Sequence, residues 1–178
     1  MDDHPKRKGD AREFSESVLS GLYEEYFDKI ARYAYLRIGD WTEAEDIAGD
    51  VFLKALESLK SYEDRGIPIQ AWLFRIAHNL VIDHFRNKQK QKTVPIDDME
   101  IEGGTNPAVL AERNVDLERL IKAMEQLTHE QKEVLGLRFF GSLSSRETGQ
   151  ILNKSDGAVR EMQRAAIEKL RNFLSIDE

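Results

Sequence analysis

The sequence predicts an all-α protein of two small helical domains joined by a flexible acidic linker. Apolar residues recur at spacings of three and four along most of the chain, as helices with one buried face require. No stretch shows the strict polar–apolar alternation of a strand. One segment rich in Pro, Gly, Asp and Glu interrupts the helical pattern. With 178 residues, the chain is long enough for two small domains.

The N-terminal domain is expected over residues 21–92. Residues 1–20 mix charges without a sustained period, so we expect a mobile arm there. A helical pattern begins at Leu22 and is interrupted at Gly39 and Asp40.

Thr42 and Glu45 fit a capping box, which predicts a second helix through about Leu59. Residues 61–68 contain Gly and Pro and predict a loop, and a third helix is expected over 70–88. The apolar face expected to be buried on the second helix comprises Ile47, Val51, Phe52, Ala55, Leu56 and Leu59.

The third helix has one narrow polar stripe. Arg75, Asn79 and Arg86 lie within about 40° of one another on the helical wheel, and most other directions are apolar. A basic stripe with aromatic neighbours such as Trp72 and Tyr62 suits single-stranded nucleic acid. The alternative is that Trp72 belongs to the core and the stripe is only the solvated face.

Residues 93–110 form the acidic linker, and the C-terminal domain is expected over 111–178. A helical pattern resumes near Ala108 and continues to about Leu127. Thr128 with Gln131 fits a capping box, which predicts a helix that ends near Gly141. Ser144 with Glu147 fits another, which predicts a short helix to Leu152. After a tight turn at 153–155, a last helix is expected over 156–174.

The last two helices predict a helix-turn-helix. Arg160 and Arg164 lie one turn apart on the second helix, which could enter a major groove. Ser155 and Asp156 can cap its start. Three more basic residues could reach phosphates: Arg138, Arg146 and Lys154. The alternative is an ordinary helical hairpin with solvated arginines.

Acidic residues gather near the start of the second helix: Glu43, Glu45, Asp46 and Asp50. Carboxylates stabilise a helix N-terminus, which accounts for one or two of them. Four of them indicate a patch for a basic protein partner.

Composition excludes several classes of protein. The chain has no cysteine, which excludes disulfides, thiolate metal sites and cysteine nucleophiles. His78 and His84 are six residues apart and cannot share a metal through one helix face, so we expect no metal, no cofactor and no enzyme. The net charge of −7 argues against nonspecific coating of DNA. We find no signal peptide and no membrane-spanning run, and expect a cytoplasmic protein.

Three segments together resemble the extracytoplasmic-function (ECF, group IV) sigma factors of the sigma-70 family. Residues 44–55 (AEDIAGDVFLKA) are similar to region 2.2, residues 71–86 (AWLFRIAHNLVIDHFR) to regions 2.3 and 2.4, and residues 127–171 to region 4. The resemblance covers about residues 22–174. It implies a factor that binds core RNA polymerase through the β′ clamp and β flap and directs promoter recognition and transcription initiation. It also implies an anti-sigma factor as a further partner.

The resemblance also implies residue roles. Glu45, Asp46, Asp50 and Lys54 would contact polymerase. The −10 element would be held by the 61–69 loop and the third helix with its polar stripe. The residues implied are Tyr62, Arg65, Trp72, Arg75, Asn79 and Arg86. The −35 element would be read by Arg146, Lys154, Ser155, Arg160, Gln163 and Arg164.

Some positions depart from the family pattern. Met162 and Ala165 replace residues that are often basic, and Glu161 replaces a small one, so the −35 preference is open. Gly149 stands where alanine is usual, costs about 1 kcal/mol of helix propensity, and is expected to permit close helix packing. Two rival hypotheses are a sigma mimic that sequesters an anti-sigma factor, and a helix-turn-helix regulator with a dimerisation domain. The retained arginines argue against the mimic, and the polar stripe argues against a dimerisation seam.

Overall fold

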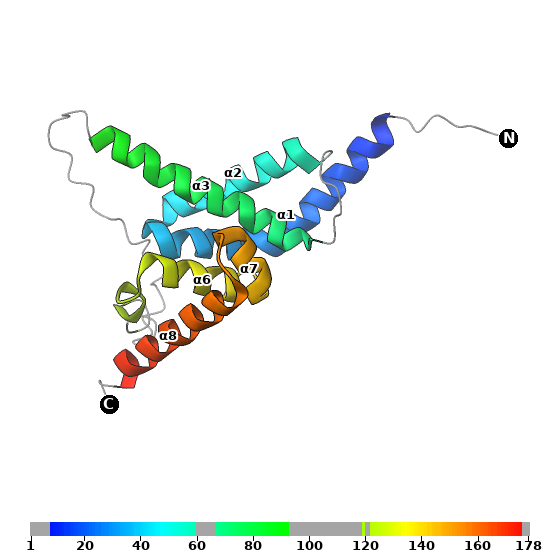
Figure 1. Cartoon of the computed structure of the whole chain (residues 1–178). Helices are drawn as coiled ribbons and strands as arrows, with labels where there is room; N and C mark the ends of the chain where they lie inside the picture. The colour runs from blue at the N-terminus through cyan, green and yellow to red at the C-terminus, as the bar shows by residue number, and fades with distance from the viewer. Residues whose placement is uncertain (1–7, 60–66, 93–118, 120–121, 176–178) are drawn as a thin grey trace.

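The structure is a computed structural model that describes residues 8–59, 67–92, 119 and 122–175. Within these ranges every regular element is an α-helix, which confirms the all-α prediction. The 93–110 linker, most of the 61–68 loop and the first seven residues lie outside them. The helices are α1 (Lys8–Ile38), α2 (Trp41–Ser58), α3 (Ile69–Lys92), α6 (His129–Phe139), α7 (Ser145–Leu152) and α8 (Asp156–Ser175) (Figure 1).

Helix α1 begins earlier than the sequence pattern predicted. It starts at Lys8 rather than near Leu22, so most of the segment expected to be an arm is helical. The described side chains between Glu16 and Gly21 are exposed or half-buried, which explains why no apolar period marks them. Helix formation adds one hydrogen bond per residue once a packed turn exists, so a helix can propagate into solvent from a buried segment.

The start of α2 also differs from the prediction. Asp40, not Thr42, is the N-cap, and its Oδ1 accepts a hydrogen bond of 2.9 Å from the Glu43 N–H. Asp is as good a cap as Thr, and Gly39 before it takes a positive φ of 78° that ends α1. Helix α3 continues four residues beyond its predicted end, through Lys92.

The other caps agree with the sequence. Thr128 with Gln131 and Ser144 with Glu147 form complete capping boxes at the starts of α6 and α7. Asn153 ends α7 in the left-handed conformation, with φ 54°. This conformation reverses the chain within three residues and delivers it into α8.

Helices α1, α2 and α3, here called the N-terminal unit, pack around a shared apolar core. Its largest fully buried side chains include Ile30, Tyr33, Val51 and Phe74. The rings of Tyr33 and Phe74 meet edge to face with centroids 5.7 Å apart.

Helices α6, α7 and α8, here called the C-terminal unit, have a smaller buried cluster among the described residues, which also includes Leu127 just before α6: Leu127, Leu135 and Ala166. Leu137 and Leu143, from the same unit, belong instead to the core of the N-terminal unit. The two units therefore pack against each other, which the sequence pattern did not predict.

Candidate DNA- and polymerase-binding surfaces

Helices α7 and α8 and the turn between them form the predicted helix-turn-helix. The Ser155 Oγ accepts a hydrogen bond of 3.2 Å from the Ala158 N–H, so Ser155 caps α8 as expected. The Ser145 hydroxyl of α7 donates a hydrogen bond to Oδ1 of Asp156. The first contact caps α8, and the second fixes the start of α8 against α7.

Gly149 allows the turn after α7 to pack closely against that helix. Its carbonyl accepts a hydrogen bond of 2.9 Å from the Lys154 N–H. A Cβ on Gly149 would lie 2.4 Å from the Lys154 carbonyl oxygen, well inside van der Waals contact. The close approach at Gly149 is therefore made by the backbone of the turn, and not by a second helix as the sequence led us to expect.

The arginines of α8 are exposed and paired with carboxylates on the same helix. Arg160 lies 2.6 Å from Asp156, and Arg164 lies 2.6 Å from Glu161 and 3.2 Å from Glu168. The hydrogen bond and the positive charge of Arg164 lower the pKa of Glu161. Ion pairs this exposed are weak and can exchange their carboxylates for phosphates.

Other predicted −35 residues have partners within the C-terminal unit. Gln163 accepts a hydrogen bond of 2.8 Å from Arg138 Nε, and Arg138 also bonds the Leu143 carbonyl. Lys154 lies 3.0 Å from Glu130. Arg146 is exposed on α7. Arg138 and Gln163 thus tie α6 to α8, so each has a structural role whether or not it contacts DNA.

The polar stripe of α3 is on the surface. Arg75, Asn79 and Arg86 are all exposed, as the helical wheel predicted. Arg86 lies 3.7 Å from Asp83 in a pair that is open to solvent. Tyr62 and Arg65, the other predicted −10 contacts, lie outside the described residues.

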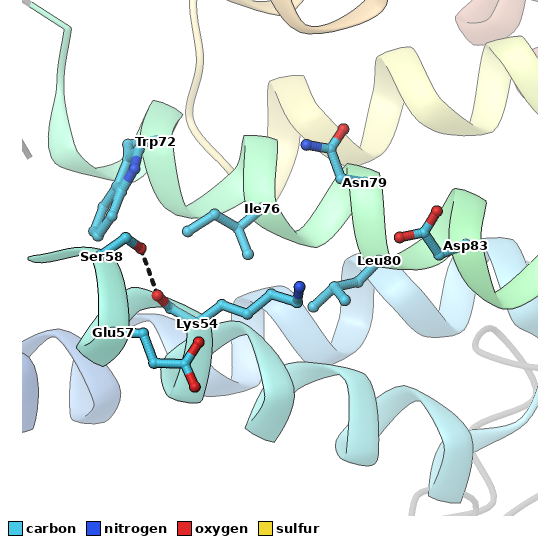
Figure 2. Close-up of a pocket in the computed structure, with 8 residues that line it drawn as sticks. All are labelled: Lys54, Glu57, Ser58, Trp72, Ile76, Asn79, Leu80 and Asp83. Atoms are coloured by element: carbon cyan, nitrogen blue, oxygen red, sulfur yellow. Dashed lines mark hydrogen bonds between the residues drawn. The ribbon is translucent and has the colours of Figure 1, made fainter. Parts of the chain in front are cut away.

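A groove of about 400 Å³ runs between α2 and α3 beside this stripe (Figure 2). It is lined by Lys54, Glu57, Ser58, Trp72, Ile76, Asn79, Leu80 and Asp83. Trp72 is half-buried in its wall, so it belongs neither fully to the core nor fully to the surface. The Ser58 hydroxyl faces it and donates to the Lys54 carbonyl (Figure 2).

The groove brings together residues that the sequence had assigned to different tasks. Trp72 and Asn79 were predicted to hold DNA, whereas Lys54 was predicted to contact polymerase. Ser58 and Ile76 were not singled out. Their positions, four residues after Lys54 and Trp72 on the same helix faces, are the signal that could have identified them.

Helix α2 presents an acidic surface with apolar neighbours. Glu45, Asp46 and Asp50 are exposed, as their predicted role requires. Leu53 beside them is 61% exposed. Leu56, expected to be buried, is 44% exposed, because α1 and α3 cover only part of the apolar face of α2.

Glu43 differs from the other acidic residues of α2. It lies 3.0 Å from Lys88 and 3.3 Å from His84, both on α3. It therefore fastens α2 to α3 and is not a free part of the acidic surface. His78 points to a different partner, Glu133 on α6.

The described residues contain no cluster of three or more His, Asp or Glu that could hold a metal ion. Among the helices of the described ranges, none combines the length and the apolar character needed to cross a membrane.

Comparison with known proteins gives two family matches along the chain. Residues 22–91 match Sigma-70 region 2, and residues 123–172 match Sigma-70 region 4. The first match covers α2, α3 and most of α1, and the second covers α6, α7 and nearly all of α8.

Two curated relatives and one solved structure extend these matches. The chain is 34% identical to the ECF RNA polymerase sigma factor BldN of Streptomyces coelicolor, over 88% of its own length and 60% of that protein. It is 30% identical to the ECF RNA polymerase sigma factor SigD of Mycobacterium bovis, over 80% of its length and 70% of that protein.

The sigma factor RpoE from Bartonella quintana, solved in complex with the anti-sigma factor NepR, shares the fold. Its TM-score is 0.68 at 22% identity, covering 89% of this chain and 98% of that one. Both family regions thus occur here in the order and on the helices that the sequence motifs indicated, and the chain belongs to the extracytoplasmic-function sigma factors of the sigma-70 family.

Proposed function

We propose that this chain binds core RNA polymerase and directs it to promoters that carry a −10 and a −35 element. One observation carries the proposal. The chain presents two separate surfaces with exposed arginines, the α3 stripe and the α8 face, within the two segments that match sigma regions 2 and 4. A sigma mimic that only sequesters an anti-sigma factor has no need of either surface.

The −10 element would be held by the α3 stripe and the groove beside it. Arg75 and Arg86 would pair with phosphates of the unpaired strand, because exposed guanidinium groups bind phosphate well. Trp72 is half-buried in the wall of the groove, where its ring would stack on a base, and the exposed amide of Asn79 would hydrogen-bond a base edge. Groove and stripe together would form the pocket that an unstacked base needs.

The −35 element would be read by α8 in the major groove. Arg160 and Arg164 would exchange Asp156, Glu161 and Glu168 for DNA phosphates or guanine edges. Ser155, Lys154 and Arg146 would hold the backbone beside the start of the helix.

The acidic face of α2 would meet polymerase. Glu45, Asp46 and Asp50 are charged and exposed, and Leu53 adds an apolar contact beside them. A protein interface combines such an apolar centre with a charged rim. As a polymerase-bound factor the chain would act in the cytoplasm, and a dedicated anti-sigma factor would cover the same surfaces.

Run-off transcription tests the proposal. Purified bacterial core polymerase is incubated with a pooled promoter library, with and without the protein. We expect new discrete transcripts that share two upstream elements. Asp50→Arg should abolish them, and Asp28→Arg, an equal charge reversal at an exposed site on α1, should not.

Loss of transcripts with Asp50→Arg should coincide with loss of core binding in a pull-down. If the wild-type protein binds neither polymerase nor promoter DNA, the sigma mimic is the better description.

A further inference from the structure

Helix α8 packs on α6 and α7 and turns a charged face to solvent (Figure 1). Its buried side includes Val159 and Ala166. Residues three and four apart are neighbours on a helix surface, so cations and carboxylates at these spacings lie side by side. The charged face of α8 comprises Asp156, Arg160, Glu161, Arg164 and Glu168.

Arg164 is held by carboxylates on two sides. Its Nε and Nη2 donate hydrogen bonds to the two carboxylate oxygens of Glu161, at 3.2 and 2.6 Å, and its Nη1 donates to Glu168 at 3.2 Å. The two bonds to Glu161 form a fork, which fixes the plane of the guanidinium group as well as its position. The hydrogen bond and the negative charge of Glu161 raise the pKa of Arg164 above its ordinary value.

Arg160 is held differently. Its Nη2 donates to Oδ2 of Asp156 at 2.6 Å, while Oδ1 of Asp156 accepts the bond from the Ser145 hydroxyl of α7. Among the described residues, Arg160 is thus bonded through one nitrogen to a carboxylate that also serves α7. The fork is particular to Arg164 on this face.

Stability does not explain the fork between Glu161 and Arg164. Both side chains are 65% exposed, and ion pairs this exposed contribute little to the free energy of folding. The fork lies on the face that α8 would turn toward DNA. Its effect is therefore to be sought in how Arg164 meets DNA.

The fork leaves one edge of Arg164 for a further partner. A guanidinium group has five N–H donors in one plane. Glu161 takes the N–H of Nε and one N–H of Nη2. Once Glu168 is released, the second N–H of Nη2 and an N–H of Nη1 can donate together to two acceptors. In a major groove, O6 and N7 of guanine are the two acceptors that arginine reads in this way.

Charge favours a base edge over a phosphate as that partner. The charged face has three carboxylates and two guanidinium groups, so it carries one negative charge in excess. A phosphate bound to Arg164 would lie close to Glu161 and be repelled by it. A guanine edge is neutral and tolerates the carboxylate.

We propose that Glu161 is a positioning residue for −35 recognition: it keeps its fork on Arg164 in the complex and so directs the other edge of Arg164 to a guanine and away from phosphates. The proposal rests on the proposed function and refines it, because of the two carboxylates on Arg164 only Glu168 is given up.

Promoter selection by the full chain bound to core polymerase tests the proposal. The −35 element is randomised, and each template carries a transcribed tag that identifies its −35 sequence. We expect a guanine preference at one position, which Arg164→Ala reduces at least about fivefold, because a bidentate pair discriminates at least this strongly.

Glu161→Gln is the decisive variant. The amide keeps the shape of the side chain but lacks the charge and one acceptor oxygen. We expect the same guanine preference to fall at least about threefold, with unchanged helical circular dichroism. Glu168→Gln is the matched control: it removes the same charge from the same face but leaves the fork, and the guanine preference should stay as in the parent.

Salt dependence separates a base contact from a phosphate contact. The polymerase complex is titrated with the selected promoter duplex at several salt concentrations. Arg164→Ala should leave the slope of log affinity against log salt unchanged in the parent. In Glu161→Gln, where Arg164 can turn to a phosphate, Arg164→Ala should reduce that slope by about one.

The outcomes distinguish this proposal from the proposed function. Equal losses of guanine preference in Glu161→Gln and Glu168→Gln would assign the effect to net charge and refute the fork. A slope reduced by Arg164→Ala in the parent, or a selected −35 element without a guanine that depends on Arg164, would also overturn the proposal. A protein that binds polymerase and selects no promoter at all would instead refute the proposed function, and this proposal with it.

Discussion

Two sets of ion pairs in this molecule behave differently because of where they lie. Glu133 pairs with Arg37 and His78 in the contact between the units, where little solvent reaches it. Arg160 and Arg164 pair with Asp156, Glu161 and Glu168 on an open helix face. A buried pair is costly to break from one side, whereas an exposed pair contributes little.

The difference assigns the two sets to different tasks. The buried cluster suits a lasting contact between the two units. The exposed pairs of α8 suit a surface that can release a carboxylate such as Glu168 when DNA arrives. The C-terminal unit thus carries both a buried charge that contacts the N-terminal unit and exposed charges that, under the proposed function, would contact DNA.

Charge reversal in the buried cluster should have the largest effect. Glu133→Lys places a cation beside Arg37 and should weaken the contact between the units by about 3–5 kcal/mol, the usual cost of a broken buried pair. The chain has no cysteine, so Thr42→Cys on α2 and Lys169→Cys on α8, both at exposed positions, accept labels, and energy transfer between them measures the contact. Arg37→Glu added to Glu133→Lys should restore part of the contact, and failure of this rescue would mean that the cluster acts only through packing.

The next effect should appear within the C-terminal unit alone. Gly149→Ala forces a methyl group toward the Lys154 carbonyl and should lower the free energy of unfolding by about 1–3 kcal/mol. Gly157→Ala, where a Cβ would meet nothing within 4 Å, should be neutral or slightly stabilising. Urea unfolding followed by circular dichroism compares them. Equal stability of the two variants would contradict the close turn described here.

A pH titration should have a smaller effect on the contact between the units. Burial alone would raise the pKa of Glu133, but the hydrogen bond from His78 and the positive charge of Arg37 lower it from its ordinary 4.5. The contribution of Glu133 is therefore complete above that value and is lost as the pH falls through the lowered value. Arg37 and Tyr33 on α1 and His78 on α3 face this carboxylate.

We therefore expect energy transfer to drop in acid, below the ordinary pKa of Glu133, before helical signal is lost. Glu133→Gln should lack this step. The same step in both proteins would assign the response to another group.

The smallest effect on stability is expected on α8. Glu161→Gln should leave the melting temperature unchanged, because both side chains of the Glu161–Arg164 pair are 65% exposed. It should nevertheless tighten binding to −35 duplex DNA, since the DNA phosphates then meet one carboxylate fewer. Titration of labelled duplex at several salt concentrations checks this. Weaker binding would show that Glu161 itself accepts a hydrogen bond from the DNA.

Local features of the fold were predictable from the sequence, and long-range ones were not. The capping boxes at Thr128 and Ser144 depend on residues three apart, so the pattern identified them. At α2 two overlapping cap patterns competed, and Asp40 rather than Thr42 forms the cap. Leu56 was expected to be buried because its spacing fits the apolar face, but it is 44% exposed, since the described helices cover it only in part.

The sequence predicted which side chains of a single helix lie on the surface, but not which helices contact one another. The helical wheel of α3 placed Arg75, Asn79 and Arg86 on one face, and all are exposed. The contact between the units had no sequence signal. Glu133 looks like an ordinary surface acid in α6, and its partners Arg37 and His78 are distant in sequence. Only tertiary packing brings these charges together.

The most direct test of this account is energy transfer on single labelled molecules of the free protein. The account predicts one high-transfer population, because the buried cluster and the apolar packing around it hold the two units together. A broad low-transfer population would contradict it.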